Sequence, residues 1–282
     1  METTKSFIHS GNAGDTLASL PAIREFYRST GKKPILYLRK GVKAFYYEGA
    51  VHPVKDEAGD SVMLNDSMIS MLMPLLKEQD FLEDVKVWDG EKIDVDLDNI
   101  RETNVGMPAF SINRWYFYVF PDLACDLTKE WMRVPDSEKD LANGKIIISR
   151  TERYNNQNID YSFLKPYEED LIFSGTMREY NNFCMRFDLN IRKLNITNFL
   201  ELAQAIKQSK FHISNQTMAF QISEGLRHPR ILEICTYAPN VIIFGENAYD
   251  FIAQQGLEYY FHKLNGTLEQ YIKSLQDSNP SA

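Results

Sequence analysis

The hydrophobic pattern at the start of the chain switches between the strand period and the helix period. Residues 6–9, Ser-Phe-Ile-His, predict a short strand, and apolar side chains then recur at helical spacing from Leu17 to Tyr27. The segment 31–34, Gly-Lys-Lys-Pro, ends that helix, and residues 35–38 are again apolar over the length of a strand. Strands and helices that alternate with short connections predict a parallel sheet with right-handed crossovers.

The middle of the chain has a weaker pattern, and the α/β rhythm returns after residue 144. Apolar spacing predicts a helix over about 65–78, whereas the aromatic segment 114–120 fits either a strand or a helix. The polar, turn-rich stretch 135–144 predicts a linker. Beyond it the pattern predicts helices at 199–208 and 217–226 and strands at 145–149, 171–174, 211–214, 230–234 and 241–244.

Chain length and composition favour two ordinary globular domains. The sequence has 282 residues, of which 44% are hydrophobic and 25% charged. Domains most often hold about 100–150 residues, and this composition is that of folded proteins. We therefore predict an α/β protein with one domain over residues 1–135 and a second over residues 136–282.

Charge and cysteine content bear on partners and compartment. A net charge of −8 argues against nucleic acid as a partner, because surfaces that bind many phosphates need clustered Lys and Arg. The cysteines Cys125, Cys184 and Cys235 are far apart and odd in number, and we find no secretion signal or long apolar run. We expect a cytoplasmic protein with at most peripheral membrane contact. The histidines are scattered without metal-ligand spacing, so we expect no structural metal.

The loop from Gly11 to Asp15, Gly-Asn-Ala-Gly-Asp, joins the first predicted strand to the first predicted helix. Glycines let the backbone approach a ligand, and the start of a helix favours anionic groups. Asp15 is therefore a candidate site residue, although an Asp here can also cap the helix by accepting backbone N–H bonds. The spacing matches neither the dinucleotide fingerprint nor a phosphate-binding P-loop.

Two further candidate loops follow predicted strands of the second domain. The loop 214–217, Ser-Asn-Gln-Thr, lies at the carboxyl edge of the predicted sheet, where ligands of open α/β folds bind. Its N–H groups and the Thr217 hydroxyl could hold a diphosphate, or Thr217 could serve only as a helix cap. The loop 149–154 offers Arg150 and Arg153 to an anion, with solvated surface arginines as the alternative.

Four segments in this order resemble the lipopolysaccharide heptosyltransferase family, glycosyltransferase family 9. The first, Phe7 to Arg24, resembles its N-terminal signature of a strand, a loop ending Gly-Asp and a helix with a Pro-Ala pair. Phe173 to Glu179 resembles its strand-Gly-x-x-x-Glu segment. Phe199 to Thr217 is similar to its helix, strand and nucleotide-site loop, and Glu224 to Pro229 to its Ala-Leu-Gly-x-Pro. The resemblance covers roughly half of the chain.

The resemblance implies the GT-B architecture, in which two Rossmann-like domains face each other across a cleft. It also implies metal-independent, inverting transfer of a sugar from a nucleotide-diphosphate donor to a hydroxyl of a glycan or another acceptor. By the same resemblance Asp15 would be the general base, Asn12 and Gly14 would bind the acceptor, and no cofactor is needed because the nucleotide sugar is a substrate. The implied donor-binding residues are Ser149, Arg150, Thr151, Arg153, Asn215, Gln216, Thr217 and Met218.

The chain departs from the family pattern in its second loop. The family has Asp-Ser/Thr-Gly and then a His, whereas this chain has Gln216-Thr217-Met218 and then Gln221. Two alternatives therefore stay open. One is a catalytically silent GT-B-fold protein that binds a nucleotide or sugar, and the other is a GT-B enzyme that acts on a nucleotide or a DNA base.

The segment from Asp94 to Asp98, Asp-Val-Asp-Leu-Asp, contains the D-x-D pattern that binds a divalent ion in another class of sugar transferases. Its carboxylates alternate with apolar residues, which is the period of a half-buried strand with one solvated face. We favour this interpretation over a metal site.

Overall fold

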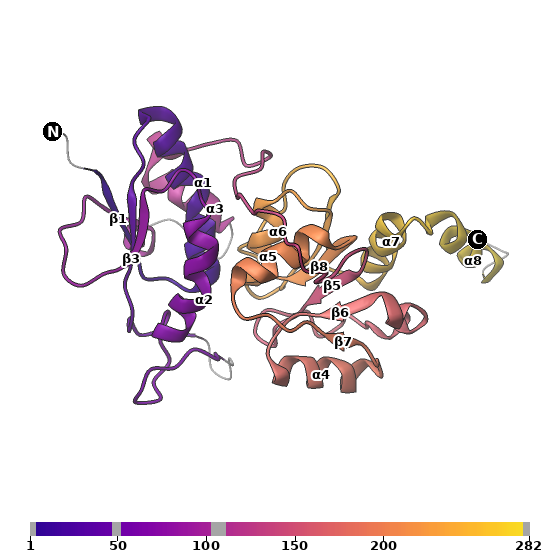
Figure 1. Cartoon of the computed structure of the whole chain (residues 1–282). Coiled ribbons are helices and arrows are strands. Elements are labelled where there is room, and N and C mark those ends of the chain that lie inside the picture. The colour runs from indigo at the N-terminus through magenta and orange to yellow at the C-terminus, as the bar shows by residue number, and fades with distance from the viewer. Residues whose placement is uncertain (1–3, 47–51, 103–110, 279–282) are drawn as a thin grey trace.

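Two parallel β-sheets, one after the other along the chain, organise the protein (Figure 1). The computed structural model describes residues 4–46, 52–102 and 111–278. The first sheet has the order β3-β2-β1-β4 and contains β1 (Ser6–His9), β2 (Ile35–Leu38), β3 (Asp84–Val87) and β4 (Val95–Asp96). The second sheet has the order β10-β9-β8-β5-β6-β7 and contains β5 (Ile146–Ser149), β6 (Leu171–Phe173), β7 (Arg192–Lys193), β8 (Phe211–Asn215), β9 (Arg230–Glu233) and β10 (Ala248–Phe251).

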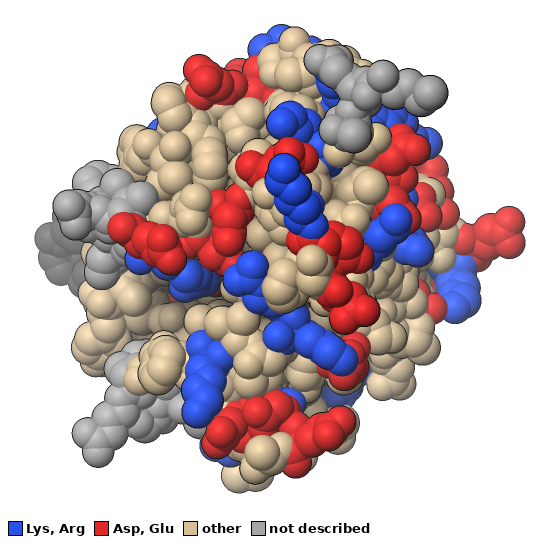
Figure 2. Space-filling view, turned by 90° about the vertical axis from the view of Figure 1, so that its left-hand side faces the viewer, with Lys and Arg blue, Asp and Glu red and all other residues tan. Residues whose placement is uncertain are grey.

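The helices of the first domain, α1 (Ala13–Thr30), α2 (Asp66–Lys77) and α3 (Ile112–Val119), lie on the side of the first sheet that faces the second domain (Figure 1). Strand side chains alternate between the two faces. Leu36 and Val85 pair across β2 and β3 and join the core under these helices, so the next pair, Tyr37 and Lys86, points the other way. That end of the molecule carries basic and acidic side chains close together (Figure 2).

Local signals set the helix ends where the sequence predicts them. The backbone of Gly31 has a φ of 68°, a left-handed conformation that glycine adopts without strain, and its N–H donates to the Tyr27 carbonyl at 2.8 Å. At the start of α2, the side chain of Asn65 accepts a hydrogen bond from the backbone N–H of Met68 at 2.8 Å. Both predicted helices are confirmed, and the ambiguous segment 114–120 belongs to helix α3.

The second domain has a core on each face of its sheet. Helices α5 (Phe199–Gln208) and α6 (Met218–Gly225) share a core with Ile147 of β5. The neighbouring Ile148 joins the other core, with residues of α4 (Met177–Phe187) and α7 (Gln254–Asn265). The last helix, α8 (Leu268–Ser278), contacts α7 at the end of the molecule away from the first domain (Figure 1). Within the described ranges, no helix is long and apolar enough to cross a membrane.

The strand predicted at 241–244 is wrong. The strand that pairs with β9 is β10, and the apolar side chains of Val241 and Ile243 instead pack as a loop on Phe220 and Leu232. The carbonyl of Phe244 accepts hydrogen bonds from the side chains of Arg227, at 2.7 Å, and Arg230 rather than from a backbone N–H of a neighbouring strand. A short apolar run shows that a segment is buried, but it does not show what kind of element buries it.

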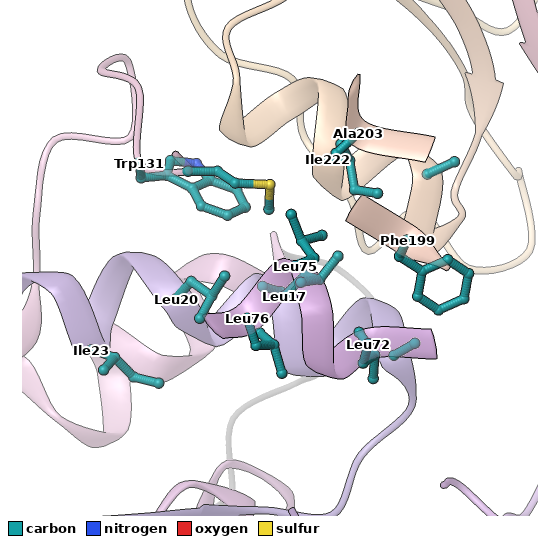
Figure 3. Packing of buried hydrophobic residues seen from close by; sticks show 14 of the residues in the cluster. Leu17, Leu20, Ile23, Leu72, Leu75, Leu76, Trp131, Phe199, Ala203 and Ile222 are labelled. Carbon is teal, nitrogen blue, oxygen red and sulfur yellow. The ribbon is translucent and has the colours of Figure 1, made fainter. Parts of the chain in front are cut away.

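One continuous hydrophobic core spans the two domains (Figure 3). Helix α1 packs against α6, and α2 packs against α5. Buried members from both sides of the interface are Leu17, Leu20, Leu72 and Leu75 of the first domain and Phe199, Ala203 and Ile222 of the second. Trp131, from the segment between the two sheets, joins the same core. The domain boundary at 135/136 lies in that connecting segment and stays a prediction.

Candidate active site between the domains

A cavity of about 510 Å³ lies between the two domains, where helices α1 and α6 begin. The helix starts are close together, since a Cβ atom built on Gly14 would lie 3.6 Å from the Cα of Met218. The first N–H groups of a helix have no partner within it, so helix starts favour anionic ligands. The cavity therefore combines two helix starts with the Asp15 side chain, which also lines it.

The structure brings most of the sequence-predicted site residues to this cavity. From the first domain it is lined by Asn12, Gly14 and Asp15, and from the second by Thr151, Arg153, Gln216, Thr217 and Met218. Ser149, Arg150 and Asn215 do not line it. Segments that are far apart in the sequence thus form one site. The roles predicted for these residues stay predictions.

Asp15 forms an ion pair with Arg101, which lies at the end of the 3₁₀ helix η1 (Leu97–Arg101). The Asp15 side chain is 18% exposed and lies in the first turn of α1, where Asn12 is the capping residue. The pKa of Arg101 is raised above its ordinary value: burial, the largest single effect, acts to lower it, but Asp15, Tyr116 and Asp98 together raise it by more. The carboxylate is thus held at the cavity by a cation.

A buried hydrogen-bond chain supports the loop that carries Asp15. The His9 ring accepts the Gly11 N–H on Nδ1 at 2.9 Å, so the ring hydrogen must be on Nε2. Nε2 lies 2.7 Å from the Tyr116 hydroxyl, which in turn donates to the backbone carbonyl of Asp15 at 2.9 Å. Burial lowers the pKa of His9 more than the nearby acidic groups raise it, which keeps the ring neutral. His9 and Tyr116 therefore position the Asp15 backbone.

Gly11 is required by this arrangement. A Cβ atom at Gly11 would lie 2.6 Å from Cε1 of His9 and 2.9 Å from Cβ of Asp15. Carbon atoms cannot approach that closely, so any side chain at this position would displace the ring or the loop. The first glycine of the Gly-x-x-Gly-Asp loop thus serves close packing beneath the site.

Arg153 reaches across the cavity to the first domain. Its Nη1 donates to Nδ1 of His52 at 2.9 Å, and its guanidinium lies 4.6 Å from the centre of the Tyr46 ring. His52 Nε2 lies 2.8 Å from the carbonyl of Val62, to which it donates. Burial, more than the neighbouring cations Arg153 and Lys55, lowers the pKa of His52, so the ring stays an acceptor for Arg153.

The loop before α6 is built as a helix start. The Thr217 hydroxyl accepts the N–H of Phe220 at 3.2 Å, so Thr217 is the cap of α6, and it also lines the cavity. Gln216 fixes the neighbouring loop, because its amide donates to the Ala238 carbonyl at 2.7 Å and its oxygen accepts the Cys235 N–H at 2.7 Å. Thr217 therefore caps α6, as one alternative predicted, and also lines the cavity.

The three predicted donor residues outside the cavity have internal partners. Arg150 forms a buried ion pair with Glu233 at the end of β9, with N–O distances of 2.7 and 3.0 Å. Asn215 clamps the loop after β5 by accepting the Thr151 N–H at 3.0 Å and donating to its carbonyl at 3.0 Å. The hydroxyl of Ser149 lies 3.0 Å from the His212 ring. Their side chains shape the loops that face the cavity.

The D-x-D segment uses its carboxylates as hydrogen-bond acceptors. Asp94 accepts the N–H of Ser6 at 2.8 Å, and Asp98 accepts the N–H of Ser10 at 3.0 Å. Only Val95–Asp96 is a strand, so the predicted half-buried strand is shorter than the alternation suggests. In the part of the chain that the structure describes, no group of three or more His, Cys, Asp or Glu side chains is placed to hold a metal ion.

Sequence reasoning missed Arg101, His9 and Tyr116 as site residues. Arg101 and Tyr116 are separated from Asp15 by 86 and 101 positions, and neither belongs to a recognisable motif. His9 ends the first predicted strand and directly precedes the Gly-Asp loop, which is the one signal that could have pointed to it.

The fold and the interdomain site define the GT-B class, with two Rossmann-like domains facing across a cleft, as the sequence predicts. The chain is similar over 98% of its length to the glycosyl transferase family 9 structure from Veillonella parvula DSM 2008, of which it covers 97%, with a TM-score of 0.57 and 9% identity. It is also similar to E. coli heptosyltransferase WaaC with ADP, covering 93% of this chain and 100% of that chain, with a TM-score of 0.59 and 9% identity. At such identities the likeness is one of fold.

The E. coli ADP-heptose LPS heptosyltransferase II has the same fold, with a TM-score of 0.55 and 12% identity over 95% of this chain and 99% of that chain. Another solved structure, TibC from enterotoxigenic E. coli, is an iron-containing dodecameric glycosyltransferase with a TM-score of 0.57 and 11% identity over 91% of this chain and 65% of that chain. The described residues offer no cluster that fits such an iron. No protein-family model matches the sequence, and a search of curated proteins gave no significant match.

Proposed function

We propose that this protein is a glycosyltransferase that moves a sugar from a nucleotide-diphosphate donor to an acceptor hydroxyl, with Asp15 as the general base. The observation that carries this proposal is the interdomain cavity that is lined both by Asp15 and by the start of α6. Structures of the same fold are described with ADP and with ADP-2-deoxy-2-fluoro heptose, which supports a nucleotide-diphosphate sugar as the donor class.

The proposed reaction inverts the configuration of the transferred sugar. Asp15 takes the proton of the acceptor hydroxyl as that oxygen forms its bond to the anomeric carbon. The bond between this carbon and the diphosphate oxygen breaks on the opposite side, and the diphosphate leaves with the electron pair. One base is enough for such a displacement.

A departing diphosphate needs positive potential at the position where its charge develops. The start of α6 and the guanidinium of Arg153, which both border the cavity, supply it in this proposal. The Thr217 hydroxyl lies at the same helix start. These groups support transfer that needs no metal ion.

Ligand binding without turnover is a second candidate function. One observation favours it: Arg101 pairs with the Asp15 carboxylate and occupies an oxygen that an acceptor hydroxyl would use. In that case the fold and the donor site remain while the base is blocked.

Release of nucleoside diphosphate from a panel of nucleotide sugars tests the proposal. Asp15→Asn keeps the size of the side chain but removes the proton acceptor, so we expect turnover to fall by about 10²–10⁴-fold with unchanged nucleoside diphosphate affinity. The matched control is Asp122→Asn, at an exposed position of the 3₁₀ helix η3 (Pro121–Leu123) outside the cavity, which should behave as the wild type. Unchanged turnover in Asp15→Asn would refute the base, and donor binding without turnover in the wild type would support the second candidate.

A further inference from the structure

The two halves of the interdomain cavity differ in chemistry. The second domain lines it mainly with polar side chains, together with the cation Arg153 and the acidic side chain of Glu179. The first domain contributes several apolar side chains from separate segments, which we call the apolar wall: Phe45, Val54, Met63, Met68, Ile112 and Trp115. Since the proposed function assigns the donor to the second domain, the apolar wall faces the acceptor.

The half of the cavity that the first domain lines, which we call the acceptor half, carries almost no unpaired charge. Among the described residues that line it, the charged side chains are Asp15 and Arg101, and these two pair with each other. His52 accepts a hydrogen bond from Arg153 and donates another to Val62, which is the pattern of an uncharged ring. No second guanidinium or ammonium from the described part of the first domain lines the cavity.

The described cations Arg39, Lys40 and Lys55, which are close to this half along the chain, do not line the cavity, and Lys55 donates to the Ser61 hydroxyl at 2.7 Å. Lys40 lies 2.9 Å from Asp66, and Arg39 lies 3.8 Å from Asp96. The sequences of segments 47–51 and 103–110, which adjoin the lining residues Tyr46 and Arg101 along the chain, contain no Lys or Arg. Neither the described residues of the first domain nor the composition of these segments supplies an unpaired cation for an anionic acceptor.

The wall discriminates against charged acceptors on physical grounds. A phosphate or carboxylate held against apolar side chains loses its hydration, and the described part of the first domain offers no unpaired guanidinium or ammonium there to compensate. Arg153 of the second domain reaches His52 at this half, but the proposed function assigns its charge to the donor diphosphate. A molecule that presents C–H groups or an aromatic ring to the wall gains from burying apolar area.

We propose that the acceptor is an uncharged molecule whose reacting hydroxyl lies beside an apolar face. A neutral sugar that presents its C–H face and a hydroxyl compound with an alkyl or aryl group share this chemistry. This inference rests on the proposed function for the identity of the reaction, but binding of the acceptor can be measured without any transfer.

Binding of matched neutral and anionic probes tests the inference. We would measure dissociation constants for phenyl β-D-glucoside and monomeric n-octyl β-D-glucoside, which carry a large apolar aglycone, for methyl β-D-glucoside, whose aglycone is only a methyl group, and for glucose 6-phosphate. At least one of the three neutral glucosides should bind, and glucose 6-phosphate should not. Stronger binding of methyl β-D-glucoside than of the other two would assign the wall to a sugar face, and the reverse to an aglycone.

A charge placed in the wall should reverse the preference. Met68→Lys introduces an ammonium at the start of α2, and we expect it to weaken binding of the neutral probes at least about tenfold and to create affinity for glucose 6-phosphate. The control Met185→Lys, at a 79% exposed position on α4, should change neither. Three outcomes would overturn the inference: the wild type prefers glucose 6-phosphate, it binds none of the neutral probes, or Met68→Lys has no effect. Binding of neutral probes in a protein that binds no nucleoside diphosphate would instead refute the proposed function.

Discussion

The core shared by the two domains predicts that they unfold together. Phe199 at the start of α5 is 7% exposed and belongs to the same cluster as Leu75 of α2, which is fully buried. Truncating a buried Phe or Leu to Ala costs about 2–5 kcal/mol, because apolar contacts are lost and a cavity remains. We therefore expect Phe199→Ala and Leu75→Ala, one on each side of the interface, to lower the same melting transition.

The size of the shift distinguishes one unfolding unit from two. An unfolding entropy of about 2.1 cal/mol/K per residue gives about 0.6 kcal/mol/K for the 282 residues, so a loss of about 3–5 kcal/mol from Phe199→Ala lowers Tm by about 5–8 °C. If residues 136–282 unfolded alone, the entropy would be about half and the shift about 10–16 °C.

Differential scanning calorimetry of the two variants gives the answer. We expect one transition in each, with equal calorimetric and van't Hoff enthalpies. Met185→Ala, on the exposed side of α4, serves as the control and should stay within about 0.5 kcal/mol of the wild type. Two transitions, of which Phe199→Ala moves only one and Leu75→Ala only the other, would refute a shared core.

Two further predictions concern buried polar groups. Tyr116→Phe removes the hydroxyl that links His9 to the Asp15 carbonyl, so we expect kcat to fall while the donor Kd measured by titration is unchanged; an unchanged kcat would contradict the positioning role. Burial, and to a lesser extent His228 and Arg230, lowers the pKa of His212 to about 3. As the pH falls below about 6.5, the ordinary pKa of histidine, His212 therefore takes up a proton in the unfolded chain but not in the folded protein. The free energy of unfolding then decreases by up to about 1.4 kcal/mol per pH unit. Denaturant titrations from pH 7 to 4 should show this decrease in the free energy of unfolding, with a smaller slope in His212→Gln. An equal slope in that variant would exclude His212 as the source of the decrease.

Much of the fold could be predicted because its determinants are local. Helix α1 begins after a glycine-containing loop and ends at Gly31, and the strands on either side of it are short apolar runs. Such signals are read within a few residues of chain. The failure at 241–244 has the opposite cause, since its apolar side chains pack on residues that are near only in the folded protein.

The candidate site was predictable only in part, because sequence cannot assign partners to polar side chains. Arg150 and Arg153 lie in one loop and offer the same guanidinium to an anion. Folding places Glu233, 83 positions further on, beside Arg150, so that this arginine becomes a buried ion pair while Arg153 reaches the cavity. The difference between them is a tertiary contact with no local signature.

The shared core also bears on how the proposed reaction would be organised. Two domains joined only by a flexible linker would have to close on each substrate before a base on one could act on a donor bound to the other. Here α1 and α6 are packed together directly behind the cavity, so that Asp15 and the start of α6 are held at a fixed separation. A fixed separation between base and donor site favours reaction, because the cost of bringing the groups together is met when the protein folds.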